Sequence, residues 1–163
     1  MALLSLALPA AVTLAAEPCY RMDTSVFEVL DGCQLGKDGT LEITPAALAR
    51  LEYDADGLSA ILVGKQHYYL RGDGRRLAVI TYDNGPDYFE EGLTRASING
   101  RISYYDKQLR PAFADSFDWG WPFKDGIAEV CQDCRPGEPD ADGHTSIVGG
   151  THYHIDRQGK RLP

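Results

Sequence analysis

Three segments of the chain resemble one another at a spacing close to 35 residues, and this period restricts the fold more than any other feature of the sequence. The opening glycines of the segments, Gly57, Gly92 and Gly126, stand 35 and then 34 residues apart, and the matching strand positions Leu70 and Tyr105 are also 35 apart. A fixed period of roughly 20–50 residues is the signature of architectures that stack one supersecondary unit on the next. The sequence therefore predicts a tandem array of about three units.

Each unit reads as a strand, a tight turn, a second strand and a charged turn. Alternating apolar residues mark the strands, as in Leu58-Ala60-Leu62 and Ile102-Tyr104. Asn99-Gly100 is a favoured pair for a type I′ hairpin turn, because both central residues of that turn need a positive φ. Asp106 and Asp156 occupy equivalent positions, and we expect them to hold turns. The predicted fold class is all-β, with hairpin units over residues 57–163 whose aligned segments, strands together with the charged turns, are residues 57–63 and 66–75, 92–98 and 101–110, and 126–130 and 150–160.

These units resemble the WG-repeat (KWG-repeat) proteins of bacteria. The resemblance is carried by YFEEGL at 88–93, WPFKDGIAEV at 121–130 and HIDRQGK at 154–160, and it covers residues 57–163. The Trp-Gly pair that names the repeat is replaced by Ile102-Ser103, His67-Tyr68 and His152-Tyr153, whereas Trp119-Gly120 falls in a linker. The resemblance implies a scaffold of β-hairpin repeats and brings no catalytic residues with it.

Residues 17–56 precede the repeats and are predicted to form a structural cap, since an array needs its open end covered. The cap should contain one short helix over residues 44–51, with Thr44 as N-cap and Pro45 at the first helical position. A short strand is expected at residues 26–30, followed by a turn at Asp31-Gly32.

The first sixteen residues carry no charged side chain, are almost wholly apolar and end in small residues. Such a stretch is too short to span a bilayer and has the length of a signal-peptide core, with Thr13 and Ala15 as an acceptable −3/−1 pair. No Lys or Arg precedes the apolar run, and a buried N-terminal helix is the alternative interpretation. We expect a signal peptide at 1–16, a periplasmic or secreted product, and no membrane insertion after cleavage.

Four cysteines follow this leader, namely Cys19, Cys33, Cys131 and Cys134. An even number in an exported chain is most simply two disulfides, for which three connectivities exist. The local pairing of Cys19 with Cys33 and of Cys131 with Cys134 needs the least reach and is the one we predict.

The net charge is −8, from 24 acidic and 16 basic residues. Nucleic acids and anionic membranes are both bound through basic surfaces, so this balance argues against either as a partner.

Candidate chemistry is sparse. Cys131 and Cys134 form a CxxC pair. The pair follows a predicted strand and precedes Pro136-Gly137, so it does not open a helix as the CxxC motif of a redox protein does. This context favours a structural disulfide at the base of the insertion 135–149 over a redox site. The acidic run at 138–143 resembles the start of a calcium loop but lacks the closing Glu, so we expect a solvated loop. No cofactor, metal site or catalytic residue is assigned. The histidines that could meet at a zinc or copper ion are His67, His144, His152 and His154.

Aromatic side chains are plentiful, with nine Tyr, five Phe and two Trp. Most must be core and should seal one hairpin against the next, but exposed Tyr and Trp are typical of binding surfaces. We therefore predict a non-catalytic binding module that contacts a protein or glycan. Its alternative is a periplasmic thiol-redox or metal-binding protein that uses Cys131 and Cys134 or the histidines. The candidate contact face comprises Tyr104, Trp119, Trp121, His152 and His154.

A reduction potential separates the binding module from the redox protein. The Cys131–Cys134 disulfide of a structural staple should have a potential below about −300 mV and resist the glutathione pool. Equilibration with glutathione redox buffers, read out by alkylation and mass spectrometry, measures it. A potential near those of disulfide oxidoreductases would favour the redox protein.

Overall fold

The computed structural model describes residues 17–22 and 27–163, so the leader predicted at 1–16 lies outside the described residues. In the described part of the chain, strands dominate and one short helix is present. This confirms the predicted all-β fold with one short helix near its N-terminal end.

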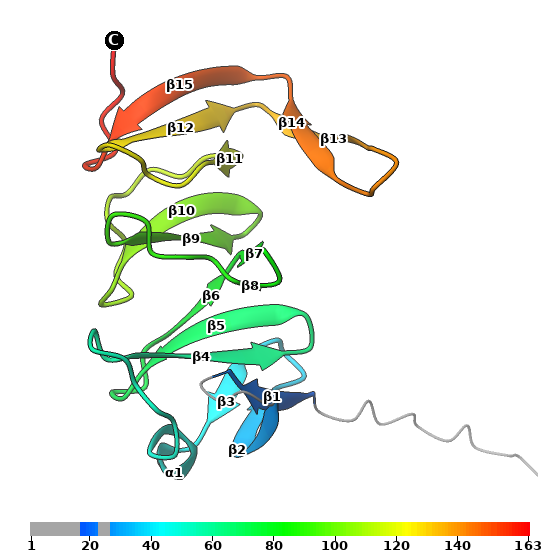
Figure 1. The fold of residues 1–163 in the computed structure, drawn as a ribbon, viewed down its shortest axis with the longest axis vertical. Helices are drawn as coiled ribbons and strands as arrows, with labels where there is room; N and C mark the ends of the chain where they lie inside the picture. Colours follow the sequence, from blue (N-terminus) through cyan, green and yellow to red (C-terminus); the bar gives the residue numbers. More distant parts are fainter. Residues whose placement is uncertain (1–16, 23–26) are drawn as a thin grey trace, which may run out of the picture.

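Three antiparallel hairpins follow one another along the long axis of the molecule (Figure 1). Each pairs six residues with six, in full register, and each occurs where the repeat predicts it. The tandem-hairpin prediction is therefore confirmed. The hairpins are β4 (Leu58–Val63) with β5 (Gln66–Arg71), β9 (Leu93–Ile98) with β10 (Arg101–Asp106), and β12 (Ile127–Gln132) with β15 (Thr151–Asp156).

The glycines that open the units share one backbone conformation. Gly57, Gly92 and Gly126 have φ values of +75°, +81° and +80°. Glu91 and Asp125, which precede the last two, also have positive φ, so each forms a type I′ pair with its glycine. The second and third units therefore open on equivalent turns, whereas Gly57 of the first unit closes a turn held by the Asp54 carboxylate.

A second turn recurs after the strands and is closed by an aspartate. The Asp106 carboxylate accepts hydrogen bonds from the backbone N–H groups of Gln108 and Arg110, both at 2.9 Å. Asp156 does the same for residues 158 and 160, as predicted from its equivalent position. Asp54 and Asp140 hold two further turns with the same pattern.

The cap is continuous with the first hairpin. Its strands β1 (Pro18–Arg21), β2 (Glu28–Leu35) and β3 (Leu41–Ile43) join β4, β5 and β6 (Arg76–Val79) in a six-stranded sheet of order β3-β2-β1-β4-β5-β6. A single hydrophobic cluster spans both regions, with Leu30 and Leu48 of the cap beside Ile61 and Leu70 of the hairpin. The cap therefore covers the end of the array by extending its sheet.

Two details of the cap differ from expectation. The turn predicted at Asp31-Gly32 is wrong, because both residues lie within β2, where the register against β1 shifts and Gly32 has a φ of +83°. Helix α1 (Pro45–Leu48) is shorter than the predicted 44–51. Its start is as predicted, since the Thr44 hydroxyl accepts a hydrogen bond from the Ala47 N–H at 3.1 Å.

Short elements connect the hairpins. β7 (Thr81–Tyr82) and β8 (Gly85–Pro86) form a small ribbon between the first two units. Trp119 and Gly120, expected in a linker, form strand β11 (Trp119–Gly120), which pairs with β12. The insertion expected to be a loop is a hairpin of β13 (Arg135–Pro139) and β14 (Thr145–Val148), called the arm below, which projects from the stack in Figure 1.

Aromatic residues between the units seal the hairpins against one another, as predicted. Tyr104 is 1% exposed, and its ring centroid lies 5.5, 6.2 and 5.1 Å from those of Phe113, Phe117 and Phe123. Burial of such side chains is the main favourable term in the folding of a hairpin array.

One ion pair is buried inside the stack. Arg95 on β9 and Asp87 after β8 have side chains that are each 3% exposed, and their Nη2 and Oδ1 atoms are 2.6 Å apart. The second carboxylate oxygen accepts the Arg95 backbone N–H at 2.8 Å, and Nη1 of Arg95 donates to the Gly120 carbonyl at 2.9 Å. The pair thus connects the linker after the first unit, the second hairpin and the start of the third unit.

Gly126→Val should destabilise the protein by about 1–3 kcal/mol, because a β-branched residue is strained at positive φ. No atom lies within 4 Å of the position of an added Cβ, so the effect reports backbone conformation alone. Gly126→Asn is the control and should cost less, since Asn tolerates this conformation. Urea denaturation measures both, and equal stability of the valine variant and the wild type would show that the repeat alignment is wrong.

Asp87→Asn should destabilise the protein by about 3–5 kcal/mol, because it leaves the Arg95 charge buried and unpaired. The double variant Asp87→Asn/Arg95→Met should lose less stability than the sum of the two single variants, since no uncompensated charge remains. Urea denaturation of all four proteins gives the coupling energy. Strict additivity would contradict the structural role of the pair.

Candidate functional site

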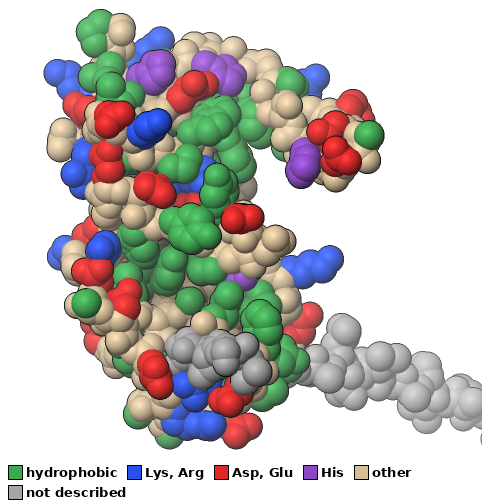
Figure 2. Space-filling view, in the orientation of Figure 1, with side chains coloured by type: hydrophobic (Ala, Val, Ile, Leu, Met, Phe, Trp, Pro, Cys, Tyr) green, Lys and Arg blue, Asp and Glu red, His purple; other side chains and the backbone are tan. Residues whose placement is uncertain are grey.

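A groove lies where the linkers before the second and third hairpins meet. We call it the aromatic groove, and its volume is about 480 Å³. This size lies within the roughly 300–1,000 Å³ of typical ligand pockets. Figure 2 shows hydrophobic side chains gathered on the hollow side of the molecule between the arm and the middle of the stack. The residues that line the groove are Tyr82, Asp87, Tyr88, Glu90, Trp121, Pro122, Phe123 and Lys124.

Two tyrosine rings stand exposed at this groove. Tyr82 is 49% exposed and Tyr88 is 51% exposed, and the rings meet edge to face with centroids 5.9 Å apart. The buried Arg95 guanidinium lies 5.7 Å from the Tyr82 ring centroid and supports this ring from the core side. Large exposed aromatic rings that are held in place are characteristic of contact sites.

The floor of the groove is fixed by buried hydrogen bonds. The Tyr104 hydroxyl donates to the Trp121 carbonyl at 2.7 Å, and the Tyr69 hydroxyl donates to the Asp87 carbonyl at 2.9 Å. Burial raises the pKa of Tyr104 and raises the pKa of Tyr69 to about 12, so both phenols remain donors at neutral pH. The groove is therefore preformed.

The five residues of the predicted contact face do not all lie together. Trp121 is half-buried and His152 and His154 are exposed on the face of the β11-β12-β15 sheet that turns away from the core, whereas the half-buried Trp119 also packs against the core cluster. The Trp119 and Trp121 rings meet edge to face at 6.2 Å, and the Trp121 ring lies 6.0 Å from that of His152. Tyr104 does not belong to this face, because its ring is buried in the core on the opposite side.

His152 connects the third hairpin to the base of the arm. Its Nδ1 lies 2.9 Å from Oε1 of Glu129, and its Nε2 lies 3.1 Å from the carbonyl oxygen of Gly149. Both partners are acceptors, so the doubly protonated, cationic ring satisfies both contacts. The hydrogen bond to the Glu129 carboxylate is the main cause that raises the pKa of His152 above its ordinary value.

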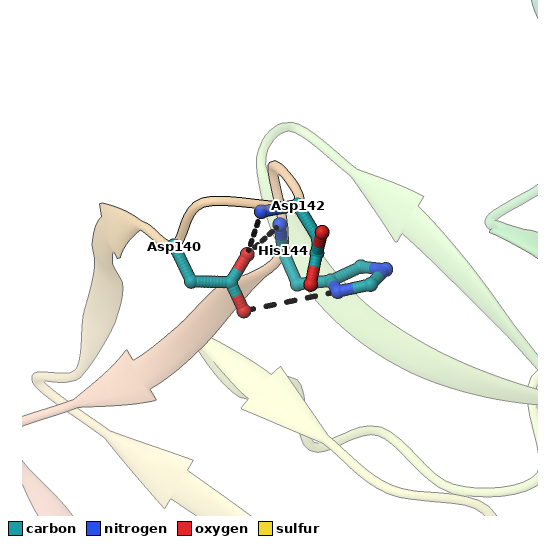
Figure 3. A group of neighbouring side chains, drawn as sticks. All are labelled: Asp140, Asp142 and His144. Atoms are coloured by element: carbon teal, nitrogen blue, oxygen red, sulfur yellow. Dashed lines mark hydrogen bonds and ion pairs between the residues drawn. The ribbon is translucent and has the colours of Figure 1, made fainter.

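The histidines do not converge on a metal site. His67 is buried on β5, where its Nδ1 lies 3.0 Å from the Thr81 hydroxyl, and burial lowers its pKa. In the described residues, the one group with the spacing of metal ligands is Asp140, Asp142 and His144 at the tip of the arm (Figure 3). All three are exposed, and Asp140 has the same turn-closing role as Asp106 and Asp156. The arrangement is explained by the turn.

The cysteines are joined as predicted, Cys19 with Cys33 and Cys131 with Cys134. The second bridge staples the base of the arm, because Cys131 lies in β12 and Cys134 directly precedes β13. Cys131 belongs to a strand and does not open a helix, unlike the first cysteine of a redox CxxC motif. Two disulfides place the protein in an oxidising, extracellular environment.

Comparisons with protein-family models, with curated proteins and with solved structures found no match to this chain. Among the described residues, no helix has the length and apolar character needed to cross a membrane.

Sequence reasoning missed the two tyrosines that open the groove. Among the aromatic residues between the hairpins, Phe89 and Phe123 pack into the core as expected for most aromatic side chains, whereas Tyr82 and Tyr88 face solvent. The alignment of the units could have separated the buried linker positions from the exposed ones. Tyr88 aligns with Pro122 and Phe89 with Phe123, 34 residues apart in each case, so one member of each linker pair could be assigned to the core.

The pKa of His152 should lie above 6.5 and fall in Glu129→Gln, because the carboxylate that stabilises the cation is lost. Since the folded-state pKa is raised, the associated stabilisation is fully present below about pH 6.5 and is lost as the pH rises through the folded-state pKa. A histidine NMR titration of both proteins measures the shift. An unchanged His152 pKa in Glu129→Gln would contradict the contact.

Proposed function

We propose that this chain is an exported, non-catalytic binding module built from WG-like hairpin repeats, which holds a protein or glycan partner in the aromatic groove. The periplasm or the extracellular medium is its proposed location, in agreement with the two disulfides. The observation that carries the proposal is the exposure of Tyr82 and Tyr88 above a preformed groove.

Binding sites commonly combine large rings with few polar groups on a rigid base. Here Arg95 lies beneath the Tyr82 ring, the Tyr88 ring meets Tyr82 edge to face, and the Tyr104 hydroxyl holds the Trp121 backbone. A partner that covers these rings would bury apolar surface without ordering the groove first, which lowers the entropic cost of binding.

The carboxylate in the floor of the groove, that of Asp87, is suited to holding the fold and not to proton transfer. Both carboxylate oxygens of Asp87 are engaged by Arg95, and Thr94 donates a further contact at 3.3 Å to Oδ2. A carboxylate that is fully occupied by a fixed cation is not free to act as a general base. This supports a binding function for the groove.

Replacement of the two exposed rings should remove the binding activity. The protein, immobilised and exposed to the exported fraction of its source, should retain a partner that the double variant Tyr82→Ala/Tyr88→Ala does not retain. Exposed aromatic anchors contribute about 2 kcal/mol or more at such sites. Equilibrium retention of the isolated partner measures the loss.

Phe27→Ala is the matched control, since Phe27 is also an exposed aromatic residue, at 66%, but belongs to the cap and not to the groove. It should bind as the wild type does. Equal retention by the double variant and the wild type would show that the aromatic groove is not the binding site.

A further inference from the structure

The charge of the aromatic groove differs from that of the whole protein. The chain carries a net charge of −8, but the Asp87 carboxylate is neutralised by Arg95 at 2.6 Å in the floor. At the lip, Glu90 and Lys124 carry opposite charges. The two charged pairs sum to zero, so the groove itself offers no net attraction to an anion or a cation.

The two lip residues stand at equivalent positions of neighbouring units. Glu90 and Lys124 each form the bridge that opens a type I′ turn, with Leu93 and Ile127 respectively. The lip therefore presents one acceptor-only group, a carboxylate, and one donor-only group, an ammonium. A ligand hydroxyl both donates and accepts, so it can bond to either group.

These features favour a polyhydroxylated ligand over a proline-rich peptide. A polyproline II segment also packs on aromatic rings, but it presents carbonyl acceptors and few N–H donors, which leaves the Glu90 carboxylate facing oxygen atoms. A sugar ring has one face of C–H groups that packs on the electron-rich face of an aromatic ring, and hydroxyls around its edge. It matches both the rings and the lip.

We infer that the aromatic groove binds an uncharged oligosaccharide, an inference that rests on the proposed function of the groove as the binding site. The Tyr82 and Tyr88 rings at one side and the Trp121 ring at the other provide the stacking surfaces. These rings offer stacking surfaces to more than one sugar residue, so we expect the ligand to be a chain of several sugar residues.

The direct test is binding of an array of uncharged oligosaccharides, each of four to six residues, with the corresponding monosaccharides and a ten-residue polyproline peptide as further probes. Calorimetry on the full mature protein should show binding of at least one oligosaccharide, much weaker binding of its monosaccharide, and no binding of the peptide. Tyr88→Ala and Trp121→Ala should each weaken the oligosaccharide by roughly tenfold or more, which is about 1.4 kcal/mol. Phe27→Ala should leave the affinity unchanged.

The salt dependence of the affinity distinguishes an uncharged ligand from a charged one. Binding of a neutral ligand should change little between low and high NaCl, because screening acts on net charge interactions. An affinity that falls steeply with salt would overturn the inference, and so would binding of the polyproline peptide in place of every oligosaccharide.

The two proposals fail in different ways. If no oligosaccharide binds but Tyr82→Ala/Tyr88→Ala still loses a partner from the exported fraction, the ligand class is wrong and the groove remains the binding site. If an oligosaccharide binds equally well to the wild type and to the groove variants, the inference is overturned together with the function proposed for the groove.

Discussion

The buried pair of Arg95 and Asp87 is the interaction on which the rest of the stack depends. Each charge is withdrawn from water, and only a partner with complete hydrogen bonding offsets the cost of that transfer. The pair meets this requirement by using groups from three segments, since Arg95 also bonds to the Gly120 carbonyl and Asp87 also accepts the Arg95 N–H. The linker after the first unit, the second hairpin and the start of the third therefore take one relative arrangement.

The aromatic groove is a consequence of this arrangement. Neighbouring linkers carry equivalent residues, and their inner aromatic residues, Phe89 and Phe123, join the core. The outer positions, Tyr88 and Pro122, then line one cavity together with Tyr82, whose ring rests on Arg95. The same guanidinium thus binds the units together and supports an exposed ring. These two roles explain why a charged residue, Arg95, lies in the core.

Local signals predicted much of the fold, and non-local pairings accounted for most of what was missed. The glycine turns that open the second and third units, the Asn99-Gly100 turn and the Thr44-Pro45 helix start each depend on a few neighbouring residues, so the sequence alone was sufficient for them. The arm was missed because Pro136 and Pro139 argue against a strand, although prolines are tolerated in an edge strand such as β13. Tyr104 was assignable to the core, since it alternates with Ile102 on one face of β10. The contact between Arg95 and Asp87 has no local signature, because it depends on how two segments meet in space.

The stacked hairpins hold the aromatic groove in a preformed shape, and the proposed partner binds there. Hydroxyl-radical footprinting tests this claim most directly, by comparing side-chain oxidation in the purified protein with oxidation of the protein in its native exported environment. Tyr82, Tyr88 and Trp121 should be protected in the native environment, whereas Phe27 should react equally in both. Equal oxidation of the three groove residues in the two settings would contradict this claim.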